Sequence, residues 1–519
     1  MSVAGENRRL RVISNYLRLL VTFVTGFLVI RLVAEIGPSA LVVYLLIIAG
    51  TGFAYFFKIV VQESVIPVLG LNHDEGQGRS FASVYWIAML ASGAAALFAL
   101  VIFAVIYALR GTFDTGALSA SAFGIALGTG ALRTVASALA TPALNGILVS
   151  GRVVHYNALV ALERLVDLGA VLAVLWLWQG AGEEAQANLF FLLSAGAYVL
   201  VQALSYGYAT RIDARYRVRP APVKRADMSW VGGIFGWNTA LVVAFLLYLR
   251  LSTFVVNASF GQAETLVLGL VFMLIGYQRQ IAMGLVIGLD AMMSRLVGGG
   301  QAGAALMVLR STWVQSVFSF FSLVVLVIWA PQIFALWLGQ SLTGSGWDLA
   351  WTVELFRIMA IGILARSLSE NWMKFLSGKG LVGRFARYIL IGGAVNAAIL
   401  IWLATAGGTG RDALHLIAVS YAVLHVVVHL GVLPIVVIRE FALPLRPFLL
   451  AVCLPGLGAA IAGVGGLALM TAAPGAVMQA VALGLILLMG AALLLPSVIS
   501  RVIHAAPVTP GATEGGSDD

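Results

Sequence analysis

The stretch that decides the fold is LVVYLLIIAGTGFAYFFKIVVQ, residues 41–62, which is long enough to cross the hydrocarbon layer of a bilayer as one helix. At about 100° per residue its polar side chains fall within an arc of about 60°. These side chains are Tyr44, Thr51, Tyr55, Lys58 and Gln62. Lipid cannot satisfy a lysine and a row of hydroxyl groups, so the stretch predicts a transmembrane helix that lines a water-filled cavity.

The composition of the whole chain is that of a polytopic membrane protein. Of its 519 residues, 61% are hydrophobic and 10% are charged, whereas about a quarter of the residues of a soluble protein are charged. The mean hydropathy is +1.00. The single cysteine, Cys453, excludes an intrachain disulfide and a cysteine metal cluster.

Fourteen apolar spans follow one another along the chain, and a basic segment that contains prolines divides them. We therefore expect an all-α integral membrane protein built from two six-helix lobes related as parallel repeats, followed by two C-terminal helices. The predicted parts are an N-terminal lobe at 1–208, a basic linker at 209–232, a C-terminal lobe at 233–436, two extra transmembrane helices at 437–504 and a disordered tail at 505–519.

The repeat is visible around two glycines. The segment VIRLVAEIGPSALVVYLLI breaks at Gly37, and TFVVNASFGQAETLVLGLV breaks at Gly261, an offset of 224 residues. Loop cations other than Arg110 and Arg411 lie on alternate loops, which places the linker and both termini in the cytoplasm. These loops account for most of the net charge of +9, so a nucleic-acid partner is not expected.

These features resemble the multidrug/oligosaccharidyl-lipid/polysaccharide (MOP) exporter superfamily, and in particular its polysaccharide transporter branch of Wzx-type flippases. The resemblance rests on the two six-span sets, the breaks at Gly37 and Gly261, the basic linker, the two extra C-terminal spans and the WAPQIFALWLG ending of the ninth span. It implies alternating access of a central cationic cavity in the bacterial inner membrane. The implied substrate is an isoprenoid-pyrophosphate-linked oligosaccharide for O-antigen, capsule or exopolysaccharide assembly. Membrane lipids and a glycan polymerase or glycosyltransferases of the same pathway are the implied partners.

Basic residues inside the spans are the candidate substrate-binding groups, because each costs about 2.5–3.5 kcal/mol at mid-membrane unless water, anions or partners meet it. The candidates are Arg18, Lys58, Arg133, Arg250 and Arg279, together with Tyr55 and Asn257. Family members with this role often carry arginines in the first, second, seventh and eighth helices. We expect a staircase of positive charge whose guanidinium groups bind a pyrophosphate.

The basic residues in the spans also have a possible structural explanation. Arg18 and Lys58 are close enough to the cytoplasmic end to extend to the membrane surface. Arg133 could pair with a carboxylate from a neighbouring helix. Arg250 and Arg279 have no acid one turn away, which favours a functional role.

Acidic residues in the spans lie mostly beside bases, which favours local neutralisation. Glu354 is close to Arg357, and Arg366 precedes Glu370 by one turn. The alternative is that Glu354 or Glu370 binds a coupling proton or sodium ion, as acids do in the drug-exporting branch of the superfamily.

No motif indicates an enzyme. The nearest approach to a P-loop, SGKG at 377–380, lacks the upstream glycine. His425 and His429 lie one turn apart without a third ligand nearby, so packing is favoured over a metal site. We expect a transporter without a cofactor or metal. A cation-coupled multidrug exporter of the same superfamily and a lipid II flippase are the alternatives.

Overall fold

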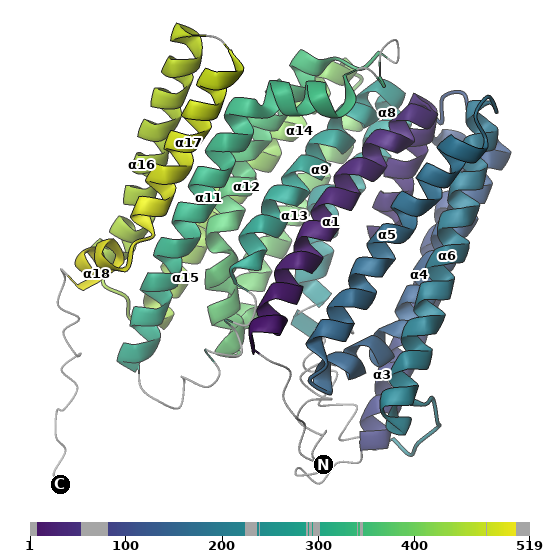
Figure 1. The fold of residues 1–519 in the computed structure, drawn as a ribbon, viewed down its shortest axis with the longest axis horizontal. Helices are drawn as coiled ribbons and strands as arrows, with labels where there is room; N and C mark the ends of the chain where they lie inside the picture. Colours follow the sequence, from purple (N-terminus) through teal and green to yellow (C-terminus); the bar gives the residue numbers. More distant parts are fainter. Residues whose placement is uncertain are drawn as a thin grey trace. The chain divides into compact units, whose positions relative to one another are not determined.

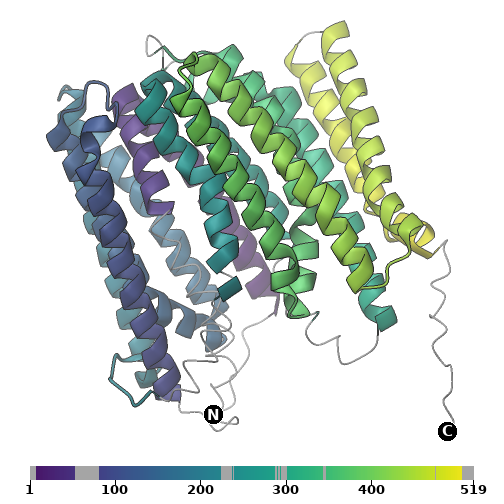
Figure 2. The same ribbon diagram turned by 180° about the vertical axis from the view of Figure 1, so that it is seen from behind.

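The computed structural model describes residues 8–52, 81–223, 236–237, 239–286, 289, 293, 301–339, 341–342, 346–473 and 475–504. All regular structure in these residues is helical (Figures 1 and 2). Eleven of the described helices are long and apolar enough to cross a membrane. An all-α protein with many membrane spans is therefore confirmed, while the number fourteen stays a prediction.

Helices account for most of the described residues. In the first half they are α1 (Arg8–Ile36), Pro38–Gly52, α3 (Phe81–Ala108), α4 (Ala120–Val149), α5 (Val153–Leu177) and α6 (Glu183–Ile212), with short turns η1 (Arg110–Thr112) and η2 (Ala214–Tyr216). In the second half they are the π-helical η3 (Leu246–Arg250), α8 (Leu251–Phe260), α9 (Gln262–Gly284), α11 (Gln301–Leu338), α12 (Leu349–Gly378), α13 (Val382–Thr405), α14 (Gly410–His425), the π-helical η4 (Val426–Val432) and α15 (Leu433–Glu440). The chain ends in α16 (Leu445–Ala472), α17 (Ala476–Leu493) and α18 (Pro496–His504).

Both predicted helix breaks are present. Gly37 is non-helical between α1 and the helix that begins at Pro38, and Gly261 separates α8 from α9. Gly261 has a φ of 99°, a conformation that glycine adopts without the steric cost of a Cβ. The span-break-span pattern is therefore confirmed at both positions.

Contacts divide the chain into two compact units, which are described separately. Unit 1 contains Met1–Leu270, Ala335–Asp348 and Gly393–Leu414, and unit 2 contains Val271–Phe334, Leu349–Gly392 and His415–Asp519. The predicted lobe boundaries stay predictions.

Small side chains hold the helices of unit 1 close together. In this unit α1 packs against α5, and α4 packs against both α3 and α6 (Figure 1). Ala95 and Ala96 of α3 meet Ala138 of α4 in one buried cluster. Such residues let transmembrane helices approach closely, where van der Waals contact replaces the hydrophobic driving force that lipid removes.

In unit 2 glycines bring α16 and α17 against each other and against α11 (Figure 2). A Cβ at Gly466 of α16 would lie 3.0 Å from Ile486 of α17, and a Cβ at Gly458 would lie 3.0 Å from Leu493. Gly490 of α17 faces the ring of Phe321 of α11. The glycines of the last two spans thus serve close helix packing.

Gly490→Val tests this packing, with Gly484→Val on the same helix as the matched control. A Cβ at Gly490 would lie 3.1 Å from Phe321, whereas a Cβ at Gly484 would meet nothing within 4 Å. We expect Gly490→Val to destabilise the protein by about 1–3 kcal/mol through overpacking, and Gly484→Val to have a much smaller effect. Unfolding in detergent measures both, and equal losses would contradict the packing described.

Candidate functional site

Three charged side chains meet inside unit 2. The Glu370 carboxylate of α12 accepts a hydrogen bond from Arg279 Nε of α9 at 3.0 Å, and from Arg366 Nε, one turn earlier on α12, at 3.4 Å. Arg366 is fully buried, whereas the Arg279 side chain is 27% exposed. Two cations and one anion leave a net charge of +1, and Arg279 is the exposed end of this cluster.

Aromatic and imidazole rings border the cluster on the side of α14 and η4. The His425 ring lies between the ring of Tyr421, at 4.0 Å, and that of His429, at 5.4 Å. His429 Nδ1 is 2.6 Å from Ser369 Oγ of α12, and His425 Nδ1 is 2.8 Å from the Tyr421 carbonyl. No group of three or more metal-ligating side chains occurs in the part of the chain that the structure describes. The two histidines pack against each other, and each makes a hydrogen bond through its Nδ1.

Glu370 is the residue that makes the burial of Arg366 tolerable. Removing one partner of a buried ion pair leaves the other charge uncompensated, at a cost of about 3–5 kcal/mol. We expect Glu370→Gln to destabilise the protein by about this amount, because the fully buried Arg366 then loses the carboxylate that accepts from its Nε. Unfolding in detergent measures the loss. The matched control is Glu354→Gln, whose half-exposed carboxylate should matter by less than about 1 kcal/mol. A Glu370→Gln protein as stable as the control would refute this role.

A second ionic cluster lies in unit 1, between α4, α5 and α6. Arg133 donates two hydrogen bonds to Asp167, from its two terminal nitrogens to the two carboxylate oxygens at 2.7 and 3.0 Å. Ser194 hydrogen-bonds both residues, and the Tyr198 ring lies 4.7 Å from the guanidinium carbon. The carboxylate partner considered for Arg133 is thus present, and this arginine is neutralised. The place of Arg133 in the predicted staircase of positive charge stays a prediction.

Glu354 pairs with a different partner from the one that its own helix offers. Its carboxylate lies 3.1 Å from His415 Nε2 of α14, and no ion pair joins it to Arg357. The acid of the Arg279 cluster likewise comes from another helix and not from α9. Both candidate coupling-ion residues, Glu354 and Glu370, therefore have basic partners, and ion coupling through them stays a prediction.

Asn257 of α8 belongs to a hydrogen-bonded connection with the loop that follows η1 in unit 1. Its side-chain oxygen accepts a hydrogen bond from Asp114 N, and its amide nitrogen donates to Asp114 O, both at 3.0 Å. The Asp114 carboxylate accepts from Gln262 N, the first residue of α9, at 3.0 Å, and from Gly116 N at 2.9 Å. Asn257 is buried and both polar atoms of its amide are hydrogen-bonded, so contact with a substrate would require this connection to open.

Acidic side chains cap both helices that begin after a break. Glu183 accepts a hydrogen bond from Ala40 N at 2.8 Å, at the start of the helix that follows Gly37. Asp114 accepts one from Gln262 N, at the start of α9 after Gly261. A carboxylate at a helix N-terminus satisfies a free N–H and opposes the helix dipole. Neither Glu183 nor Asp114 is among the residues predicted from the sequence to have a structural or functional role. The turn D-T-G at 114–116 is a local signal, but its partner is about 150 residues away.

Asp114→Ala tests whether this connection limits access to the buried side of α8. Loss of a capping contact costs about 1 kcal/mol, which corresponds to about fivefold in an opening equilibrium. The reporter is Ser252→Cys on α8, which is fully buried, in a Cys453→Ser background. We expect Asp114→Ala to speed its labelling by a membrane-impermeant maleimide about fivefold. Asp412→Ala, which removes another acid at a helix N-terminus, should leave labelling unchanged. Equal rates in both variants would contradict the role of Asp114.

The remaining predicted cations lie in unit 1 or outside the described residues. Arg18 of α1 is half-buried, and its Nε has no hydrogen-bond partner. Arg250 ends the π-helical turn η3, and a Cβ at Gly52 would lie 2.5 Å from Arg250 Nε. π-helical turns occur frequently at functional sites. Lys58 and Tyr55 lie outside the described residues.

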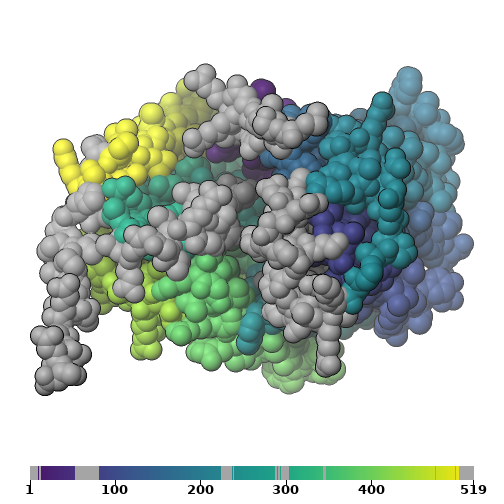
Figure 3. All heavy atoms as spheres, turned by 90° about the horizontal axis from the view of Figure 1, so that it is seen from below, coloured from purple at the N-terminus to yellow at the C-terminus, as the bar shows by residue number. Residues whose placement is uncertain are grey.

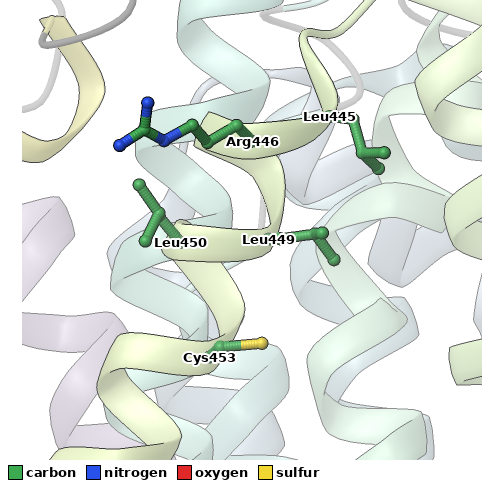
Figure 4. Close-up of a pocket in the computed structure, with 5 residues that line it drawn as sticks. All are labelled: Leu445, Arg446, Leu449, Leu450 and Cys453. Atoms are coloured by element: carbon green, nitrogen blue, oxygen red, sulfur yellow. The ribbon is translucent and has the colours of Figure 1, made fainter.

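A shallow pocket on the surface of α16 does not have the chemistry of a substrate site. Leu445, Arg446, Leu449, Leu450 and Cys453 line it, all from this single helix (Figure 4). One guanidinium at the edge of an apolar surface offers no converging polar groups. The Arg279 cluster is therefore the candidate functional site in unit 2.

No protein-family model matches the sequence, and no curated protein matches it. Solved structures do match the fold. The lipid II flippase MurJ in an inward closed conformation has a TM-score of 0.67 at 9% identity, covering 95% of this chain and 99% of that one. A MATE family multidrug resistance transporter in an inward-facing conformation matches with a TM-score of 0.57 at 12% sequence identity. The match covers 83% of this chain and 99% of that one. A MOP superfamily transporter from Pyrococcus furiosus matches with a TM-score of 0.57 at 9% sequence identity. The match covers 84% of this chain and 96% of that one.

The fold is therefore that of the MOP superfamily transporters, and the protein is a multi-pass membrane protein. The structures that it resembles are flippases and transporters, not enzymes. The resemblance stated from the sequence agrees with these structures at the level of the fold.

Proposed function

We propose that this protein is a secondary transporter that moves an isoprenoid-pyrophosphate-linked oligosaccharide across the bacterial inner membrane. The observation that carries the proposal is the extent of the likeness to the lipid II flippase, a protein with a lipid substrate. That structure covers 95% of the chain and the MATE transporter 83%. The difference, about 12% of 519 residues, is close in size to the segment Leu445–His504 that contains α16, α17 and α18.

The net charge of the Arg279 cluster supports an anionic substrate. A pyrophosphate carries several acceptor oxygens, and a partly exposed guanidinium can bind two of them at once. Arg279 is the more exposed of the two arginines, so its guanidinium is the group that an anionic substrate would contact. In this proposal Arg18, Lys58 and Arg250 supply further contacts along the path. Glycosyltransferases that make the substrate, and a polymerase that consumes it, are the expected partners.

The membrane potential can drive such a reaction without ATP. Each elementary charge is worth about 2.3 kcal/mol per 100 mV, so two negative charges leaving a cell that is negative inside gain about 4.6 kcal/mol. A cationic drug would instead meet the net-positive cluster, which is why a multidrug exporter is the weaker alternative. A lipid II flippase shares the pyrophosphate chemistry and differs only in the glycan.

Transport by reconstituted protein tests the proposal. Proteoliposomes would be supplied with a fluorescent isoprenoid-pyrophosphate oligosaccharide, with lipid II, or with the cationic dye ethidium, under an imposed potassium-diffusion potential. We expect flipping of the oligosaccharide to be fastest and to fall at least tenfold in Arg279→Gln, because a hydrogen bond to a charged group contributes about 1.5–3 kcal/mol. Arg279→Lys should recover part of the activity.

Arg357→Gln is the matched control, since Arg357 is an exposed arginine of α12 outside the cluster. It should leave flipping unchanged. Transport of ethidium without flipping of the oligosaccharide would contradict the proposal and indicate a multidrug exporter. Flipping of lipid II alone would contradict it and indicate a lipid II flippase.

A further inference from the structure

The segment that follows α6 carries basic side chains that lack acidic partners. Arg211 lies in the last turn of α6, and Arg217 and Arg219 follow in the described part of the predicted linker. All three are exposed, and none forms an ion pair with a described residue. Arg215 differs, because Asp213 neutralises it at 2.8 Å. Three uncompensated positive charges therefore lie within nine residues.

Tyr216 fixes the backbone of this segment to the bundle of unit 1. Its side chain is fully buried, and its ring lies 5.8 Å from that of Phe81 and 5.7 Å from that of Tyr85. Its hydroxyl shares a 2.9 Å hydrogen bond with Ser150 Oγ, and its carbonyl accepts one from Tyr85 at 2.8 Å. Gly146 leaves the space for this ring, because a Cβ there would lie 2.5 Å from it.

A second contact fixes the segment further along. Ser83 Oγ of α3 donates a hydrogen bond to the Pro222 carbonyl at 2.7 Å. Arg217 and Arg219 lie between the two contacts, so their backbone is ordered before any ligand binds. A surface that is already ordered avoids the entropy cost of fixing a loop on binding.

Exposure along α6 shows which way Arg211 faces. Leu200 and Leu204 are 59% and 54% exposed, and they share one helix face with Gly207 and Arg211 at spacings of three and four residues. An exposed apolar stripe on a transmembrane helix faces acyl chains, so the arginine that ends the stripe lies at the level of the lipid head groups. Dark-teal atoms from this part of the chain are at the surface in Figure 3.

We propose that Arg211, Arg217 and Arg219 form a binding surface for the phosphate groups of anionic phospholipids in the adjoining leaflet. Guanidinium groups bind phosphate through paired hydrogen bonds. Val218, 42% exposed between two of the arginines, provides apolar contact at the boundary between head groups and acyl chains. The continuity with the lipid-facing stripe of α6 identifies a membrane lipid as the occupant. The surface is independent of the proposed substrate site.

Native mass spectrometry of the purified full-length protein tests this surface, with phosphatidylglycerol and phosphatidylcholine as the probes. In the triple variant Arg211→Gln, Arg217→Gln, Arg219→Gln we expect affinity for phosphatidylglycerol to fall about fivefold for each arginine removed. Affinity for phosphatidylcholine should not change. The matched control triple is Arg439→Gln, Arg446→Gln, Arg501→Gln, which removes the same charge from exposed positions in unit 2.

Three results would overturn the proposal: equal losses in the two triples, no loss in the first, or equal binding of the two lipids by the native protein. Should the first triple fail to fold, Arg219→Gln alone, compared with Arg439→Gln alone, makes the same comparison with one fivefold step. Neither result depends on transport of a glycan, so failure here would leave the proposed function intact.

Discussion

The cost of placing charge in an apolar helical bundle is the constraint on which the interior of this protein depends. Arg366 is fully buried and is tolerated because Glu370 lies one turn away on the same helix. Arg133 is tolerated because Asp167 meets both of its terminal nitrogens from a neighbouring helix. In each pair the attraction between the two charges offsets a desolvation penalty that would be too large for either charge alone. Each pair also joins helices or helix turns in a membrane, where lipid removes the hydrophobic driving force between helices.

The two ionic clusters differ in composition. In the cluster of unit 1 Asp167 pairs with Arg133, and the Glu163 carboxylate accepts hydrogen bonds from the uncharged side chains of Gln202 and Tyr198. In the cluster of unit 2 two arginines share one carboxylate oxygen, and the more exposed of them is Arg279. A partly exposed guanidinium is the physical basis for proposing an anionic substrate.

The helix breaks at Gly37 and Gly261 create helix ends with polar contacts in unit 1. A break exposes the N–H groups that begin the next helix, and these groups need acceptors. Glu183 and Asp114 provide them, and Asp114 also holds Asn257 through its backbone. The same contacts that satisfy the helix ends therefore also join segments that are far apart in the sequence.

The sequence by itself determined the membrane class, the helical character of the spans and both helix breaks, because these follow from composition, periodicity and residue type. It also identified Arg18, Arg133, Arg250 and Arg279 as residues that need an explanation. Only the tertiary structure decided their partners. Asp167 for Arg133, Glu370 for Arg279, His415 for Glu354 and the Asp114 backbone for Asn257 all come from other helices or loops. Periodicity fixes which face of a helix a side chain occupies, but not which helix lies opposite.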